Sequence, residues 1–64
     1  MHLLRLPEVK ERTGLSRSVI YEYIQKGRFP KPVNITPRSV AWVDEEVDAW
    51  IRERVEERGE RGMA

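Results

Sequence analysis

The residues best suited to chemistry in this sequence are hydrogen-bonding side chains gathered between Ser16 and Lys26. Arg17, Ser18 and Tyr21 recur at positions that share one face of a helix. A guanidinium group can donate two parallel hydrogen bonds to a guanine edge, and hydroxyl groups can bond bases or phosphates. This segment therefore favours recognition of double-stranded nucleic acid, against the alternative of an ordinary polar helix surface.

Catalytic chemistry, by contrast, has few candidates. The sequence contains no cysteine and a single histidine, His2, beside the N-terminus, and its carboxylates fall on the surfaces of predicted helices. A nucleophile with its base, or a cluster of metal ligands, needs residues that are missing here. We expect no enzymatic activity, no metal and no cofactor.

Two short helices joined by a three-residue turn are predicted to position the polar side chains. The first helix should start near Pro7 and end at residue 12 or 13, where Gly14 can adopt the left-handed conformation that stops a helix. Ser16 can cap a second helix over about 16–26, and nothing breaks that helix before Gly27. This spacing is typical of a helix-turn-helix.

A β-hairpin is predicted after the second helix. Two prolines make residues 28–32 an extended connector, and two segments rich in β-branched residues, Val33–Ile35 and Ser39–Val43, flank the turn Thr36–Arg38. The hairpin over 33–43 would form the wing of a winged helix-turn-helix.

A last amphipathic helix is predicted from Glu45 to Arg58, with Gly59 as its end and residues 59–64 as a flexible tail. Trp42 and Trp50 should lie in the core, with Tyr23 and Phe29 sealing its edges. The fold class is then mainly α with a small β-hairpin, in the order α-α-β-β-α, and residues 1–58 form one domain. With 64 residues there is room for only one small core.

The net charge of +1 is the sum of two opposed regions. Residues 1–43 have eight Lys or Arg against three Glu, whereas residues 44–64 have four Arg against eight acids. The positive charge surrounds the second helix and the hairpin, as expected of a surface that meets phosphates. The candidate DNA-binding residues are Ser16, Arg17, Ser18, Tyr21, Gln25, Lys26, Arg28, Lys31 and Arg38.

The acidic last helix has two interpretations. Its outer face is either a solvated surface that closes the core or a surface that meets another protein, and exposure of Trp50 or Val55 would favour the second. No apolar run approaches the roughly 20 residues of a membrane helix, and no signal peptide is recognisable, so we expect a cytoplasmic, nucleoid-associated protein.

The sequence also resembles a known family, the AlpA family of small phage and prophage transcriptional regulators, which are related to excisionases and to the DNA-binding domain of MerR-type regulators. The similarity covers about residues 3–52. The matching segments are Leu4-Arg5-Leu6-Pro7-Glu8-Val9, Thr13-Gly14-Leu15-Ser16-Arg17-Ser18, Ile20-Tyr21, Gly27-Arg28-Phe29-Pro30-Lys31-Pro32-Val33, Trp42-Val43 and Glu46-Val47-Asp48-Ala49-Trp50-Ile51.

This resemblance implies a bacterial or phage protein that binds double-stranded DNA, with its second helix in the major groove and its hairpin on the adjacent backbone or minor groove. It implies a small transcriptional regulator, with an excisionase-like architectural factor for recombination as the alternative. A protein-interaction adaptor is the alternative of another class. Further partners left open are a second copy bound side by side on DNA, an integrase and a polymerase.

One position departs from the family pattern. Glu22 stands where similar sequences often have a basic residue. Its carboxylate should pair with Arg17, with Lys26 or with cytosine N4, or else the corresponding phosphate contact is absent.

Overall fold

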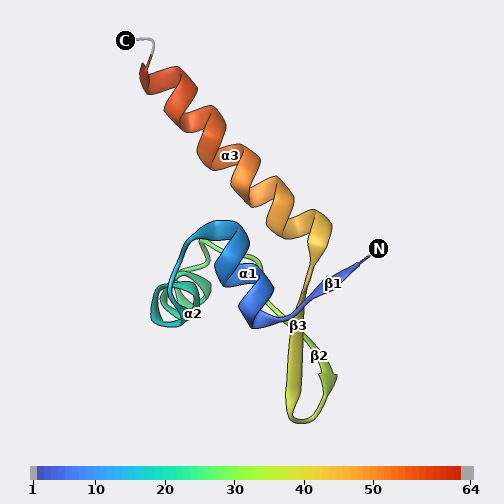
Figure 1. Cartoon of the computed structure of the whole chain (residues 1–64). Coiled ribbons are helices and arrows are strands. Elements are labelled where there is room, and N and C mark those ends of the chain that lie inside the picture. Colours follow the sequence, from blue (N-terminus) through green and yellow to red (C-terminus); the bar gives the residue numbers. More distant parts are fainter. Residues whose placement is uncertain (1, 63–64) are drawn as a thin grey trace.

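Over the residues that the structure describes, the chain forms three helices and a small antiparallel sheet, which confirms the predicted fold class (Figure 1). The computed structural model describes the backbone of residues 2–62 and the side chains of residues 2–58. The elements in chain order are β1 (Leu3–Leu4), α1 (Leu6–Thr13), α2 (Arg17–Gln25), β2 (Val33–Thr36), β3 (Ser39–Val43) and α3 (Asp44–Gly62).

The α1–turn–α2 unit forms where the helix signals predict it. The Glu8 carboxylate accepts a hydrogen bond from the Arg5 backbone N–H at 3.1 Å, at the start of α1. Gly14 ends α1 with φ of 74°, and its N–H donates to the Lys10 carbonyl at 2.8 Å. The Ser16 hydroxyl caps α2 by accepting from the Val19 N–H at 3.3 Å. Helix α2 ends at Gln25, one residue before the predicted limit.

The sheet has three strands in the order β1-β3-β2 rather than the two of a simple hairpin. Strand β1 pairs with β3 so that Leu4 lies opposite Trp42, and β2 pairs with β3 so that Val33 lies opposite Ala41. Sequence reasoning missed β1 because two residues are too short for an alternating pattern. Its effect is to tie the N-terminal segment to the base of the hairpin.

The core lies between the helix pair and the sheet. Trp42, Leu4, Ile20, Val9 and Val47 are its largest fully buried side chains. The indole N–H of Trp42 donates to the Pro30 carbonyl at 3.0 Å, so the buried polar atom is satisfied.

Two aromatic placements differ from the prediction. Phe29 belongs to the core rather than to its edge, with 5% of its surface exposed. Trp50 is only half-buried and packs against the outside of the core, because α3 leaves the body soon after its first turn. The prediction of two core tryptophans therefore holds for Trp42 alone.

Helix α3 continues to Gly62, so the predicted stop at Gly59 is wrong. A glycine ends a helix when it takes a left-handed conformation; the described glycines with positive φ are Gly14 and Gly27. Within a helix, glycine costs only about 1 kcal/mol relative to alanine. The helical backbone thus enters the predicted tail, whose last two residues lie outside the described part; the domain boundary at residue 58 stays a prediction.

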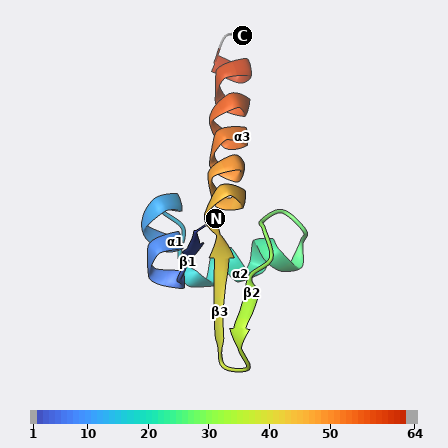
Figure 2. The same cartoon turned by 90° about the vertical axis from the view of Figure 1, so that its right-hand side faces the viewer.

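Helix α3 and the hairpin extend in opposite directions from the helix pair α1–α2 and the core beside it, which we call the body (Figures 1 and 2). The molecule is accordingly elongated, with principal extents of 47 × 24 × 19 Å. The acidic helix and the predicted wing are therefore held apart.

Candidate nucleic-acid interface

One face of α2 presents most of the predicted site residues to solvent. Arg17, Ser18 and Gln25 are exposed, while Val19 and Ile20 turn to the other side of the helix and Ile20 is fully buried. The N-terminal turn of α2 is accessible to a ligand, because Ser16, Arg17 and Ser18 are all exposed. The exposed face thus offers guanidinium, hydroxyl and amide donors within about two turns.

Tyr21 has a partly structural role on this face. Its ring is half-buried, lies edge-on to Trp42 with centroids 6.2 Å apart, and supports the Arg17 guanidinium carbon 5.7 Å from its centroid. The cation–π contact pre-positions the Arg17 side chain along the helix surface. Ser16, another predicted site residue, uses its oxygen as the α2 cap, which leaves its hydroxyl hydrogen available as a donor.

Glu22 forms an ion pair with Lys26, one of the alternatives left open by the sequence. The Lys26 ammonium nitrogen lies 2.8 Å from the Glu22 carboxylate, one helical turn away. The hydrogen bond and the charge of Lys26 lower the pKa of Glu22 below its usual value, so the carboxylate is ionised at neutral pH. The positive charge of Lys26, predicted to face phosphate, is therefore balanced within α2.

The other predicted cations surround α2 at the surface. Arg28 and Lys31 are exposed on the connector between α2 and β2, and Arg38 is exposed at the hairpin turn. The turn is closed by a hydrogen bond from the Arg38 backbone N–H to the Thr36 hydroxyl at 3.2 Å. Among the side chains that the structure describes, none of these three cations or Arg17 is in an ion pair.

One cation of the basic region has a structural partner that the sequence did not indicate. Arg12 on α1 lies 2.6 Å from Asp44, the first residue of α3, across 32 positions of sequence. This contact joins the helix pair to α3 at its acidic N-terminal turn, and it removes Arg12 from the charges available to a ligand.

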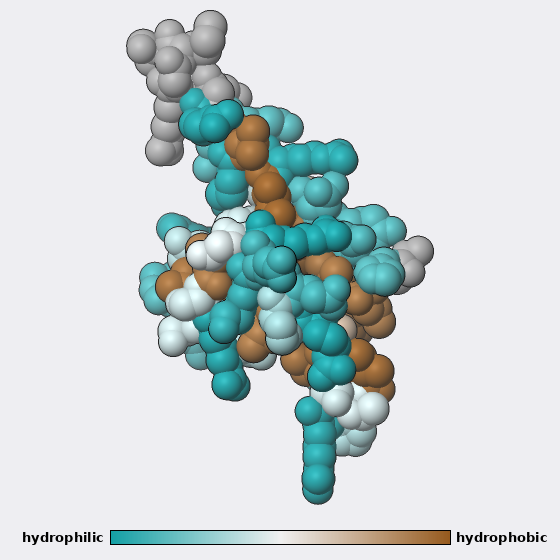
Figure 3. Space-filling model, in the orientation of Figure 1, coloured by the Kyte–Doolittle hydropathy of each residue, from teal (hydrophilic) through white to brown (hydrophobic). Residues whose placement is uncertain are grey.

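The acidic α3 is more exposed than a helix that only closes a core. Val55 is 50% exposed, Trp50 is half-buried, and hydrophobic atoms continue along α3 beyond the body in Figure 3. By the criterion set from the sequence, this exposure favours a surface that meets another protein.

Other kinds of site find no support in the described part of the chain. The side chains of residues 2–58 form no group of three or more His, Cys, Asp or Glu that could hold a metal ion. No helix there is both long enough and apolar enough to cross a membrane.

A helix-turn-helix followed by a hairpin, with donors on one face of its second helix, defines the winged helix-turn-helix class. Within that class, the chain belongs to the family of the prophage CP4-57 regulatory protein (AlpA), whose model matches residues 2–55. The resemblance inferred from the motifs is thereby confirmed.

Two relatives illustrate the range of the family. The chain is 52% identical over 52 residues to ORF88 of Enterobacteria phage P4, an uncharacterized protein; the match covers 81% of this chain and 59% of that relative's length. It is 33% identical over 60 residues to the DNA-binding transcriptional activator AlpA of Escherichia coli K12, covering 84% of this chain and 86% of that protein.

Proposed function

We propose that this chain is a transcriptional regulator that binds double-stranded DNA sequence-specifically, with α2 in the major groove and the hairpin on the adjacent backbone or minor groove. The observation that supports this most is the exposed face of α2, where hydrogen-bond donors are surrounded by cations without ion-pair partners among the described side chains. The E. coli relative, named as a DNA-binding transcriptional activator, supports the same function.

The roles of the individual residues follow from their chemistry. Arg17, Ser18 and Gln25 are placed to read base edges, because bidentate guanidinium and amide groups distinguish guanine and adenine. Arg28, Lys31 and Arg38 are placed to bind phosphates and so to set the orientation of α2 on the duplex. Ser16 caps α2 and keeps its hydroxyl hydrogen as a donor for DNA, and Tyr21 supports the Arg17 side chain.

The direct test is binding to DNA as a function of salt. The affinity for a fluorescent mixed-sequence duplex, measured by anisotropy, should fall with a log–log slope of about −3.6 if Arg17, Arg28, Lys31 and Arg38 each neutralise one phosphate. Selection from a random duplex library should then recover a preferred sequence with an affinity at least about a thousandfold higher than for mixed-sequence DNA. A flat salt response, or failure to enrich any sequence, would refute the proposal.

A further inference from the structure

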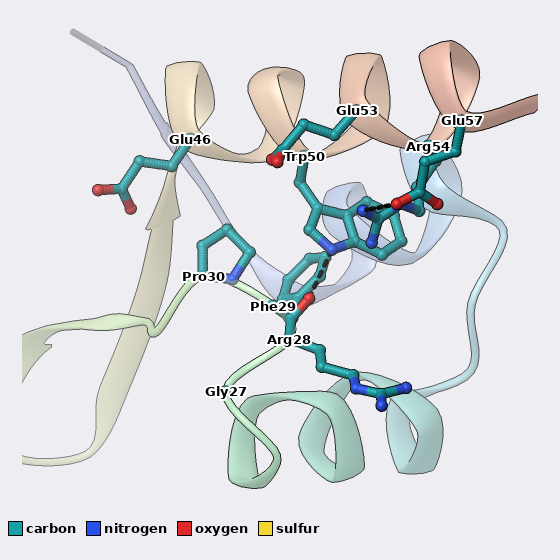
Figure 4. Close-up of a pocket in the computed structure, with 9 residues that line it drawn as sticks. All are labelled: Gly27, Arg28, Phe29, Pro30, Glu46, Trp50, Glu53, Arg54 and Glu57. Atoms are coloured by element: carbon teal, nitrogen blue, oxygen red, sulfur yellow. Dashed lines mark hydrogen bonds and ion pairs between the residues drawn. The ribbon is translucent and has the colours of Figure 1, made fainter. Parts of the chain in front are cut away.

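A groove lies between α3 and the connector that follows α2, on the side of the connector away from α2 (Figure 4). Its volume is about 680 Å³. Phe29, Pro30 and Trp50 provide its apolar wall, and Glu46, Glu53 and Glu57 on α3 provide carboxylates. We call it the Trp50 groove.

Trp50 is held in a fixed position in this groove. Its indole N–H donates to the Arg28 carbonyl at 2.6 Å, and its ring lies edge-on to Phe29 with centroids 5.0 Å apart. In Figure 4 the side chain of Trp50 points from α3 toward the connector, with Glu53 beside it on the same helix. These contacts fix the orientation of the half-buried ring, so binding a partner would not require the indole itself to move.

The groove already contains one example of the contact it favours. The guanidinium carbon of Arg54 lies 5.2 Å from the centroid of Trp50, and a nitrogen of the same group lies 2.9 Å from Glu57. A guanidinium between an aromatic face and a carboxylate is a favourable arrangement for cation recognition. The position of Arg54 shows that the groove has room for a guanidinium group between the Trp50 ring and a carboxylate.

Two further carboxylates at the groove remain available. Glu46 and Glu53 are exposed and have no ion-pair or hydrogen-bond partner among the described side chains. The charged residues that line the groove are three glutamates and two arginines, and residues 44–58 of α3 contain seven acids and three arginines, so the surroundings have a net negative charge. Phosphate would be repelled here, whereas a positively charged segment would be attracted.

We propose that the Trp50 groove binds a basic segment of a partner protein, which places an arginine or lysine over Trp50 and between Glu46 and Glu53. This function goes beyond DNA binding and uses the opposite sign of charge. A second copy is a poorer occupant, since the apolar residues of α3 outside the groove, Ile51 and Val55, offer far less than the roughly 1,200 Å² of a stable interface.

The location of the groove would place DNA and protein partner on two sides of one connector. The Arg28 carbonyl faces Trp50, while its side chain extends away from that ring, toward α2, in Figure 4. Both ligands could then be bound at once, with the partner carried above the duplex by α3.

The experiment uses a fluorescein-labelled peptide of alternating arginine and leucine as the probe, with a glutamate–leucine peptide as the control ligand. The double variant Glu46→Gln/Glu53→Gln should bind the arginine peptide about tenfold more weakly than the unmodified chain, since each exposed ion pair contributes about two- to fivefold. The double variant Glu11→Gln/Glu56→Gln has the same net charge and alters exposed carboxylates outside the groove, so it should weaken binding less than about twofold.

A second pair of variants tests the role of the Trp50 face. Arg54→Ala should expose the ring and strengthen peptide binding by about two- to fivefold. Arg52→Ala removes the same charge from α3 but leaves the groove intact, because Arg52 pairs with Asp48 instead. Equal gains in the two variants would show a general charge effect and refute the assignment.

Affinity for duplex DNA, measured on the same samples, shows whether each variant is folded and still binds DNA. A failure of the groove proposal can then be distinguished from a failure of the proposed DNA-binding function. The two Glu→Gln double variants should bind mixed-sequence DNA equally. Equal loss of peptide binding in both double variants would overturn the proposal. So would sedimentation equilibrium that gives the mass of a dimer for the unmodified chain and of a monomer for Glu46→Gln/Glu53→Gln, because a second copy would then occupy the groove.

Discussion

The ion pair between Glu22 and Lys26 makes a quantitative prediction about DNA binding. Substitution Glu22→Gln removes the only acid from the exposed face of α2 and releases the Lys26 ammonium group, now 2.8 Å from the carboxylate, to bind phosphate. One additional neutralised phosphate steepens the log–log salt dependence by about 0.9, from about −3.6 to about −4.5. The variant's gain in affinity should therefore shrink by about 3.5-fold between about 50 and about 200 mM salt.

The structure also specifies why the change should act on binding rather than on folding. Both side chains are 54% exposed, and an exposed ion pair one turn apart contributes little to helix stability. The Lys26 contact lowers the pKa of Glu22, so the contribution of the pair is present above the unfolded-state pKa and is lost only as pH falls through the lower folded value. Measurements at neutral pH therefore compare an ionised carboxylate with a neutral amide.

The assay is fluorescence anisotropy on a mixed-sequence duplex over a salt series, with Glu56→Gln as the matched control. Glu56 is an exposed acid on α3, so its substitution makes the same change in net charge away from the proposed interface. Equal slopes for the two variants would refute the reasoning. A selective loss of affinity for the preferred sequence in Glu22→Gln would instead assign Glu22 to a cytosine N4 contact.

Three further predictions concern the interface and the fold. Arg17→Ala should cost about 1–3 kcal/mol for the selected sequence and relax preference at one base pair, whereas Arg38→Ala should weaken all sequences alike in competition assays. Trp42→Ala should cost about 3–5 kcal/mol in urea unfolding, and Trp50→Ala clearly less, because only Trp42 is fully buried; the reverse order would contradict the packing. Gly14→Ala should cost about 1 kcal/mol in the same assay, since Gly14 has φ of 74°, and an unchanged midpoint would contradict that conformation.

Local signals in the sequence accounted for the elements that such signals can specify. The turn at Gly14, the Ser16 cap and the Pro37 turn each depend on a residue with a particular backbone preference, and each lies where it was predicted. Strand β1 and the end of α3 were missed for a different reason. The two-residue strand β1 forms because β3 offers it a hydrogen-bonding partner. Whether a helix ends at a glycine or continues through it depends on differences of about 1 kcal/mol, which local sequence does not settle.

The features of the candidate site also fall into two groups, those that local spacing predicts and those that depend on the tertiary fold. Spacing alone identified the face of α2, and an acid four residues before a lysine made the Glu22–Lys26 pair foreseeable. The Arg12–Asp44 pair joins positions 32 residues apart and depends on the tertiary fold. The Trp50 groove also has a signal in the sequence: Glu46, Trp50, Glu53 and Glu57 recur at intervals of four and three, which places them on one face of a helix.

Charge pairing determines which ligand each half of the molecule can attract. A formal count gives residues 1–43 eight cations, but Arg12 and Lys26 are balanced by Asp44 and Glu22. Six cations remain: Arg5 and Lys10 at α1, and Arg17, Arg28, Lys31 and Arg38, which surround α2 and attract phosphate to the proposed interface. Helix α3 likewise balances some of its acids internally, yet Glu46 and Glu53 stay available beside the half-buried indole of Trp50. Because α3 and the hairpin extend in opposite directions, the two opposite charges act on different ligands instead of cancelling, and a net charge of +1 is compatible with tight binding of both.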